Sequence, residues 1–501
     1  MKKPNPMRFS NLSLRLAAVI LLQAGCQAQD SNRAIALSAP CYTVSFDPQN
    51  LRAIHVAATL LLKTDTLYMS QSDVEPLNDG FAHFVDHLSA TTSDGKKIKL
   101  QLVGSSMWKL SVPVPSTVYL SYDVTIGHDA VPWSVSAAFA RGYATPDVVF
   151  FAGRAVFITP RQVDTNAITI QYLLPAQWKI ENGYTAVNEP DHVFRAPTLA
   201  DLWRNGNFAG HFVQKEIQVN QLRIEIAGTE QMAGGVELFR SALSGIVEAY
   251  NTEMGGAPEG KLAIMASVCN LPAGGESFRH SISMSFMRSP DMSNKSRWGY
   301  LLAHEVFHLW NGQAIAPAQQ SQVEWFVEGF TEYMCTLAAC KTGLISQTEF
   351  LQQLSNSRNS YLAGAGKVSL KEAGLQKGLN YGLIYDGGMS VALALDIGIR
   401  QASGNSKSLI DLMKAMYTQF GKTGIPYSYE DIVRTTSAVT GKDISDFFKK
   451  YVSGIEVIPV DKYLSAVGLE AVSESGQSQI RAQSNATDAQ KQLLQSILSK
   501  P

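Results

Sequence analysis

The chain has no marked excess of charge of either sign, few cysteines and no long hydrophobic run. Its 501 residues include 42 Lys and Arg against 43 Asp and Glu, which gives a net charge of −1. A protein that binds nucleic acid needs an excess of basic residues, so this composition indicates no nucleic-acid partner. Of the five cysteines, Cys335 and Cys340 fall about 140° apart on an expected helix, which argues against a disulfide between them. A pairing of Cys41 with Cys269 stays open.

The one pronounced apolar run, residues 16–22, is too short for a membrane-spanning helix of about 20 residues. Four basic residues precede it: Lys2, Lys3, Arg8 and Arg15. This layout is that of a secretory signal, so we expect residues 1–28 to direct the chain out of the cytoplasm. Cys26 resembles the lipid acceptor of bacterial lipoproteins, although Gln23 stands where Leu is usual, and cleavage after Ala28 is the alternative. The expected location is extracytoplasmic: periplasmic, anchored to a membrane through a lipid on Cys26, or secreted.

Alternating hydrophobicity marks residues 41–228 as a β-rich N-terminal domain. Between residues 118 and 126, apolar side chains alternate with Ser121, Asp123 and Thr125, which is typical of a strand with one buried face. Further strands are expected at 42–46, 55–63, 97–103, 149–158, 167–173 and 211–226. Helical periodicity begins at Val236, so the segment 228–235 marks the predicted domain boundary.

The second half combines strands and helices. Strands are expected at 261–268 and 282–287, and helices near 386–402, 409–420, 430–439 and 444–452. Asp396 and Arg400 lie four residues apart on the first of these helices, which usually indicates a solvated helix face. Residues 472–501 are polar and are expected to form a flexible tail. The predicted architecture is α+β and multidomain: an all-β domain, then a catalytic domain over 235–471 with a mostly helical C-terminal lobe.

Residues 304–308, His-Glu-Val-Phe-His, carry the strongest chemical signal. Positions four apart lie on one face of a helix, so His304 and His308 can direct two imidazoles to one metal ion. Zinc in hydrolases takes three protein ligands and a water molecule, so a third ligand is needed. Glu305 is placed to take a proton from that water as general base. The apolar stripe of the same segment fits a helix packed on a core, with or without a metal.

The third ligand is expected on a second helix, within the segment 325–333, Trp-Phe-Val-Glu-Gly-Phe-Thr-Glu-Tyr. Glu328 is the first candidate, with Glu324 and Glu332 one turn away on either side. Two roles stay open for Glu332: a solvated surface carboxylate, or an acceptor for the second ring nitrogen of a ligating histidine. The 19 residues between His308 and Glu328 suffice for a helix end, a loop and the next helix start. The sequence thus predicts one zinc ion per chain.

Together with Ile-Tyr-Asp-Gly-Gly at 384–388 and Asp-Phe-Phe-Lys-Lys-Tyr-Val-Ser-Gly at 446–454, these motifs resemble the glycyl aminopeptidase family of thermolysin-like zinc peptidases, the gluzincins. The resemblance covers roughly residues 235–471. It implies a thermolysin-like catalytic domain, with zinc held by His304, His308 and Glu328. It also implies that Tyr385 donates a hydrogen bond to the oxyanion of the tetrahedral intermediate, with Tyr381 as a neighbouring competitor.

The substrate edge of that family is altered in this chain. The family's Gly-Gly-Leu-Glu-His corresponds here to Gly-Gly-Glu-Ser-Phe-Arg-His at 274–280. By the resemblance, Gly274 and Gly275 belong to the edge that meets the substrate. Glu276 either binds the free ammonium group of a peptide or caps a turn. Substrate-end recognition is therefore the least determined part of the site.

The sequence predicts a zinc metallopeptidase that acts on a peptide or protein substrate, aminopeptidase-like in its chemistry. An endopeptidase of the same fold is the alternative within this class. A non-catalytic zinc-binding lipoprotein or binding module is the alternative from another class. The altered segments 274–280 and 384–388 motivate that alternative, and the intact Glu305 argues against it.

Overall fold

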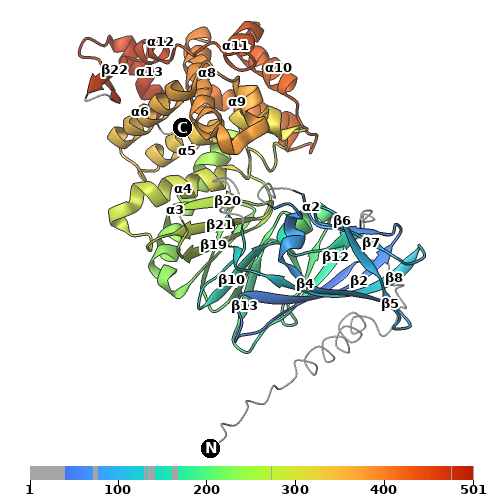
Figure 1. Cartoon of the computed structure of the whole chain (residues 1–501). Coiled ribbons are helices and arrows are strands. Elements are labelled where there is room, and N and C mark those ends of the chain that lie inside the picture. The colour runs from blue at the N-terminus through green and yellow to red at the C-terminus, as the bar shows by residue number, and fades with distance from the viewer. Residues whose placement is uncertain are drawn as a thin grey trace, which may run out of the picture. The chain divides into compact units, whose positions relative to one another are not determined.

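The computed structural model describes residues 40–71, 77–128, 131, 141–160, 167–271, 273–474 and 477–499. The expected secretory signal at 1–28, with Cys26, lies outside these residues and stays a prediction. The chain divides into two compact units, and the change of unit falls between Phe212 and Val213. Strands dominate the first unit, whereas helices follow a smaller sheet in the second (Figure 1).

In its described residues, the first unit is built from strands β1 to β16, with three short helices between them. The strands are β1 Cys41–Phe46, β2 Ala53–Leu62, β3 Thr66–Tyr68, β4 Val85–Thr92, β5 Lys97–Ile98, β6 Leu100–Gly104, β7 Met107–Leu110, β8 Ser116–Thr125, β9 Tyr143–Ala144, β10 Val148–Ala152, β11 Thr159–Pro160, β12 Ile168–Leu173, β13 Lys179–Asn182, β14 Thr185–Asn188, β15 Val193–Ala196 and β16 Gly206–Gly210. The helices are η1 Gly80–Phe84, η3 Gly153–Ala155 and α2 Leu199–Trp203.

These strands form one large sheet and two smaller ones. The eight-stranded sheet has the order β14-β15-β12-β1-β2-β8-β4-β5, and the four-stranded sheets have the orders β13-β16-β10-β9 and β11-β3-β7-β6. Strand β8 shows the predicted alternation, because Val118, Leu120 and Tyr122 are buried while Ser121 and Asp123 are partly exposed. The prediction of a β-rich N-terminal domain is confirmed.

A five-stranded sheet opens the second unit. Its strands are β17 Val213–Val219, β18 Leu222–Gly228, β19 Gly260–Val268, β20 Gly274–Ser277 and β21 Ser281–Phe286, in the order β17-β18-β19-β21-β20. The prediction that 211–226 belongs to the first domain is wrong, because β18 pairs in parallel with β19. The boundary therefore precedes β17 and does not lie at 228–235. Alternation identifies a strand but not its distant partner, and this explains the error.

Helices make up most of the remaining unit (Figure 1). They are η4 Glu230–Met232, α3 Ala233–Met254, η5 Met292–Asn294, α4 Lys295–Phe307, η6 Gln320–Gln322, α5 Glu324–Lys341, α6 Gln347–Gly364, α7 Leu370–Ala373, η7 Gly374–Leu379, η8 Leu383–Gly387, α8 Gly388–Ala402, α9 Leu409–Met416, η9 Tyr417–Gly421, α10 Tyr429–Thr440, α11 Ser445–Tyr451, α12 Val460–Ala466 and α13 Asp488–Leu498. Helix α3 packs against β17 and β18, and α4 contacts β20. No helix in the described ranges combines the length and apolar character needed to cross a membrane.

The C-terminal segment is folded, so the prediction of a flexible tail over 472–501 is wrong for its described residues. Strands β22 Leu469–Glu474 and β23 Gln477–Ala482 form a hairpin that precedes α13. The backbone N–H of Ile480 donates to Ser355 Oγ on α6 at 2.8 Å, and Ile480 and Ile497 are buried. A few well-spaced apolar side chains fix this segment, although its average composition is polar.

The Asp396–Arg400 pair is buried, which corrects the prediction of a solvated helix face. Asp396 is 1% exposed and Arg400 is 7% exposed. Arg400 Nε donates to Asp396 Oδ1 at 3.1 Å, the backbone N–H of Leu409 donates to the same oxygen at 2.8 Å, and the Tyr333 hydroxyl donates to Oδ2 at 2.8 Å. The pair thus links α5, α8 and the start of α9 inside the helical lobe.

Candidate metal centre

Helix α4 presents His304 and Glu305 from a firmly anchored segment. Asp291 caps the turn before the helix, since its carboxylate accepts hydrogen bonds from the backbone N–H groups of Ser293 and Asn294. On the buried side, the Tyr250 hydroxyl of α3 donates to the carbonyl of Ala303 at 2.9 Å. Helix α4 ends at Phe307, and His308 follows with helical dihedral angles, so the four-residue spacing of the two histidines is kept.

The structure brings His304, His308 and Glu328 to one point. The two Nε2 atoms are 3.1 Å apart, and Glu328 Oε2 lies 3.6 Å from Nε2 of His304 and 3.4 Å from Nε2 of His308. Three atoms bound to one tetrahedral zinc at 2.0 to 2.1 Å would be separated by roughly 3.3 Å. All three residues are buried, and their donor set of two imidazoles and one carboxylate suits zinc. The side chains therefore fit a zinc ion.

Asn311, which the sequence analysis did not single out, contacts both His308 and the helix that carries Glu328. The carbonyl of Asn311 accepts a hydrogen bond from His308 Nδ1 at 2.9 Å, which leaves Nε2 with its lone pair for a metal. The side-chain Nδ2 of Asn311 donates to the carbonyls of Phe326 and Val327 at 3.0 Å each. One buried residue thus fixes the ring of His308 and the helix that carries Glu328. The spacing of three residues between His308 and Asn311 is the sequence signal that could have identified Asn311.

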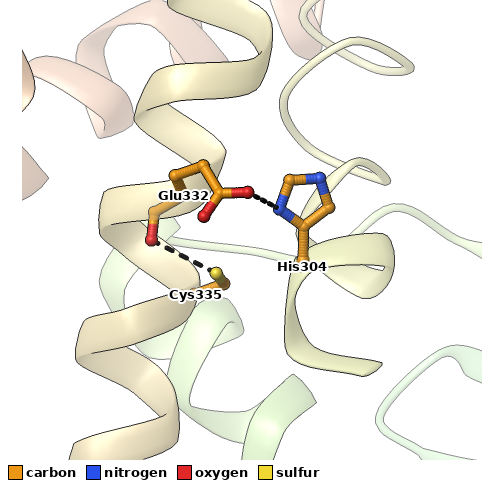
Figure 2. A group of neighbouring side chains, drawn as sticks. All are labelled: His304, Glu332 and Cys335. Atoms are coloured by element: carbon orange, nitrogen blue, oxygen red, sulfur yellow. Dashed lines mark hydrogen bonds and ion pairs between the residues drawn. The ribbon is translucent and has the colours of Figure 1, made fainter. Parts of the chain in front are cut away.

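Glu332 is not a solvated surface carboxylate. Its Oε1 lies 3.1 Å from His304 Nδ1, within ion-pair distance although the geometry is not that of a hydrogen bond. Burial, together with the charge of Asp386, raises the pKa of Glu332 to about 8. Figure 2 shows Glu332 reaching from α5 to the Nδ1 side of His304, with Cys335 on the next turn of the same helix. Of the two roles left open for Glu332, this placement fits the acceptor of the second ring nitrogen.

Cys335 completes a second group that could hold a metal, with His304 and Glu332. Its thiol donates to the carbonyl of Glu332 at 3.2 Å (Figure 2). Burial raises the pKa of Cys335 well above its usual value, with repulsion by Glu332 adding to the effect. Metals bind the thiolate, so this group is a poor metal site. Cys335 and Cys340 form no disulfide, as the helix geometry predicts.

Two glycines let the helix that carries Glu328 approach α8. A Cβ atom at Gly329 would lie 2.3 Å from backbone atoms of Gly388, and one at Gly388 would lie 2.0 Å from the carbonyl oxygen of Trp325. Real Cβ contacts are never this short, so the crossing of α5 and α8 requires glycine on both sides. The crossing brings the π-helical segment η8, which contains Tyr385, against α5. Such segments occur frequently at functional sites.

Tyr385 and Tyr381 both lie at the candidate site. The ring of Tyr385 stacks on that of His304, with centroids 6.2 Å apart, and on that of Tyr381 at 3.9 Å. Tyr385 thus lies beside a predicted zinc ligand, and Tyr381 stacks on Tyr385. Tyr381, which the sequence offered as the alternative to Tyr385 for the oxyanion role, is thus a direct neighbour of Tyr385.

Strand β20, the last strand in the order of the described sheet, runs past Glu305. A Cβ atom at Gly275 would lie 2.7 Å from Cγ, Cδ and Oε1 of Glu305, so a larger residue there would displace the Glu305 side chain. Burial raises the pKa of Glu305 to about 8, and repulsion by the Glu276 and Glu328 carboxylates adds to the effect. The charge of Glu276 therefore acts on the buried Glu305. Both roles expected for Glu276, binding a substrate ammonium and capping a turn, stay predictions.

Lys377, which the sequence analysis also missed, lies on the far side of Glu328 from the histidines. Its Nζ is 2.5 Å from Glu328 Oε1 and 3.0 Å from Glu324 Oε2. Burial opposes the lysine charge, but attraction by Glu328 and Glu324 outweighs it and raises the pKa of Lys377 above its usual value. A separation of 49 residues from Glu328 left no local signal for this contact.

Two family models match the chain. The Peptidase M61 N-terminal domain matches residues 42–204, and the M61 glycyl aminopeptidase model matches residues 298–384, which include the three converging side chains. The two matches confirm the resemblance to the M61 glycyl aminopeptidase family. They support a peptidase hydrolase, which confirms the prediction drawn from the His304 and Glu328 motifs.

Solved structures share the fold of this chain. An aminopeptidase N family protein from Idiomarina loihiensis has a TM-score of 0.75 at 20% identity, over 87% of this chain and 79% of that one. Two structures of an M1 zinc metallopeptidase from Deinococcus radiodurans, one of them a mutant, each have a TM-score of 0.55 over 84% of this chain and 95% of theirs, at 13% and 14% identity. The α+β multidomain architecture is thereby confirmed. No curated protein matches the chain in sequence.

Proposed function

We propose that the second unit hydrolyses peptide bonds with one zinc ion held by His304, His308 and Glu328. The observation that carries the proposal is the triangle formed by two Nε2 atoms and Glu328 Oε2, with edges of 3.1, 3.4 and 3.6 Å. Two imidazole nitrogens with lone pairs at 3.1 Å repel each other unless a proton or a cation lies between them. When bound, zinc supplies a Lewis acid that polarises the scissile carbonyl and lowers the pKa of water toward about 7.

The proton transfers are assigned to Glu305. Its carboxylate accepts a proton from the attacking water, and the same carboxyl delivers that proton to the leaving nitrogen as the carbon–nitrogen bond breaks. The hydroxyl of Tyr385 donates a hydrogen bond to the oxyanion that forms on the former carbonyl oxygen. Support comes from the buried position of Glu305 beside His304 and from the ring of Tyr385, whose centroid lies 6.2 Å from that of His304.

The substrate is proposed to lie along β20. An extended peptide can add to the edge strand of a sheet, and Gly275 brings β20, the last strand in the order of this sheet, close to Glu305. A cavity of about 370 Å³ lies between α4 and α6, lined among others by Arg297 and Tyr300 of α4 and by Glu349 of α6. None of the proposed zinc ligands lines this cavity, so the proposed path of the substrate rests on β20 alone.

The first test is the substitution Glu305→Gln, which keeps the shape of the side chain but removes its basicity. We expect the variant to hold zinc with wild-type stoichiometry, measured by elemental analysis, and to lose about 10²- to 10⁴-fold in kcat/KM on a peptide library. Glu430→Gln, on an exposed part of α10, serves as the matched control and should leave both quantities unchanged. Bound zinc with no hydrolysis by the wild-type chain would instead favour a non-catalytic binding module.

Free and N-acetylated versions of one peptide distinguish an aminopeptidase from an endopeptidase. We propose aminopeptidase-like hydrolysis, in line with the family, so the acetylated peptide should be cleaved far more slowly. Equal cleavage of both peptides would establish the endopeptidase alternative.

A further inference from the structure

Glu328 divides its two carboxylate oxygens between two different partners. Oε2 faces the Nε2 atoms of both histidines, whereas Oε1 lies 2.5 Å from Nζ of Lys377. Within the described part of the chain, no other Lys or Arg forms an ion pair with Glu328. A charge-assisted hydrogen bond of this length restrains the rotation of the carboxylate about its terminal bond. The lysine therefore decides which oxygen of Glu328 faces the histidines.

The segment that carries Lys377 is itself tightly placed. A Cβ atom at Gly374, the first residue of η7, would lie 2.0 Å from the carbonyl oxygen of Ser321, so η7 packs directly against the chain before α5. Asn380 Nδ2 donates to the carbonyls of Ala373 and Gln376 at 3.3 and 3.1 Å, which closes the turn around the lysine. These contacts hold the start of the lysine side chain, and its Nζ is shared between Glu324 and Glu328 at the far end.

The buried position of the Lys377 ammonium group is energetically unfavourable, and a merely structural role does not explain it. The Lys377 side chain is only 22% exposed, and burying an ammonium group is unfavourable unless it is fully paired. An apolar residue of similar size would fill the same space without that cost, but it would leave Glu328 free to present both oxygens to a cation. Catalytic zinc sites hold the metal with three protein ligands and leave a fourth position to water, so a second oxygen from Glu328 would compete with that water.

We propose that Lys377 is a positioning residue that holds Glu328 as a one-oxygen zinc ligand, an inference that rests on the zinc site of the proposed function. By capturing Oε1, the lysine leaves Oε2 alone to complete the site with the two histidines. A fourth coordination position then stays open for water. This role of Lys377 depends on its contact with one particular oxygen of Glu328 and not on the net charge of the site.

The test compares Lys377→Met, Lys377→Arg and the control Lys371→Met in the full chain. Lys371 lies six residues earlier, and its Nζ stands over the ring of Tyr429 and away from Glu328. We expect Lys377→Met to bind zinc about 10- to 100-fold more weakly in a competition with a chromophoric chelator. Lys377→Arg should recover most of this loss, and Lys371→Met should match the wild type. Circular dichroism confirms that each variant is folded.

Cobalt substitution reports the coordination directly, without any turnover. In the wild-type chain we expect the strong visible absorption of four-coordinate Co²⁺, and in Lys377→Met the weaker absorption of a site with more oxygen ligands. Wild-type zinc affinity and an unchanged cobalt spectrum in Lys377→Met would overturn the inference. Failure of the wild-type chain to bind either metal would overturn the proposed function itself, so the two failures are distinguishable.

Glu324→Gln provides the remaining comparison, because it removes the second carboxylate partner of Lys377 and leaves the contact with Glu328. We expect its zinc affinity to change by less than about threefold. A loss as large as that of Lys377→Met would show that the general charge balance matters, and would contradict the specific hold on Glu328 Oε1.

Discussion

Two buried clusters of charged groups lie in the helical part of this protein, and they differ in how completely their groups are paired. In the Asp396 cluster one acid faces one base, and both carboxylate oxygens accept hydrogen bonds, from Arg400, Leu409 and Tyr333. At the candidate metal centre the carboxyl groups of Glu305, Glu324, Glu328 and Glu332 gather around two imidazoles and Lys377. A buried charge alone therefore does not mark a functional site.

The imbalance at the metal centre is visible in individual atoms. His304 Nδ1 and Asn311 Oδ1 are buried without a hydrogen bond, and burial raises the pKa of Glu305 to about 8. Groups of this kind destabilise a fold unless a ligand satisfies them. The Asp396 cluster stabilises the lobe, whereas the metal centre keeps unsatisfied groups that a cation and a substrate can use. Each of the following substitutions tests this distinction.

The largest effect is expected for Asp396→Ala. The substitution leaves the Arg400 guanidinium buried without its carboxylate, so we expect the free energy of unfolding to fall by about 3 to 5 kcal/mol. Denaturant titration measures this loss. The folded fraction should bind zinc as the wild type does, because the cluster has no part in the metal site. Asp446→Ala, which breaks the exposed Lys450–Asp446 pair on α11, is the control and should leave stability unchanged. Loss of zinc binding by folded Asp396→Ala would contradict the separation of the two clusters.

A smaller loss is expected for Gly329→Ala at the crossing of α5 and α8. The new methyl group would meet the backbone of Gly388 at 2.3 Å, so the helices must separate, at a cost of about 1 to 3 kcal/mol. Because Glu328 precedes Gly329, zinc affinity should fall as well. Gly398→Ala on α8 is the control, since a Cβ there meets nothing within 4 Å and alanine favours helix by about 1 kcal/mol. Unchanged stability in Gly329→Ala would show that the crossing tolerates the methyl group.

The local parts of the site were predictable from sequence, and the distant parts were not. Helix geometry alone predicts that His304 and His308 can bind one metal ion. The family resemblance supported the roles predicted for Glu328 and Tyr385. Lys377 comes from a short turn far along the chain, where no periodicity signals a contact. The role of Asn311 depends on carbonyls of a second helix, which become neighbours only after folding.

The same limit explains the errors in the fold. Alternation correctly predicted β8, but it could not show that β18 pairs with β19 across the helix α3. Composition suggested a tail after residue 472, although buried Ile480 and Ile497 are enough to dock the hairpin and α13. For Asp396 and Arg400 the four-residue spacing was correct, and only the burial differed from the prediction. Burial of a helix face depends on what packs on it, and a single helix sequence does not contain that information.

The substitution Glu332→Gln tests whether the carboxylate that faces His304 supports zinc binding. If Glu332 orients His304 through Nδ1, the amide should weaken zinc binding by about 10- to 100-fold while changing stability little. Chelator competition measures the affinity. Cys335→Ala, one turn away in Figure 2, is the matched control, and its zinc affinity should equal that of the wild type. Equal losses in both variants would instead assign the metal to the group formed by His304, Glu332 and Cys335.

The smallest effect is expected for Glu276→Gln. Glu276 lies on β20 beside Gly275, its side chain is partly exposed, and its charge adds to the raised pKa of Glu305. Solvent screens a partly exposed carboxylate, so it contributes little to the binding of an ammonium group. We therefore expect kcat/KM to change by less than about threefold on both free and N-acetylated peptides. A loss confined to free peptides would assign the ammonium-binding role to Glu276 and place it with the unbalanced groups of the centre.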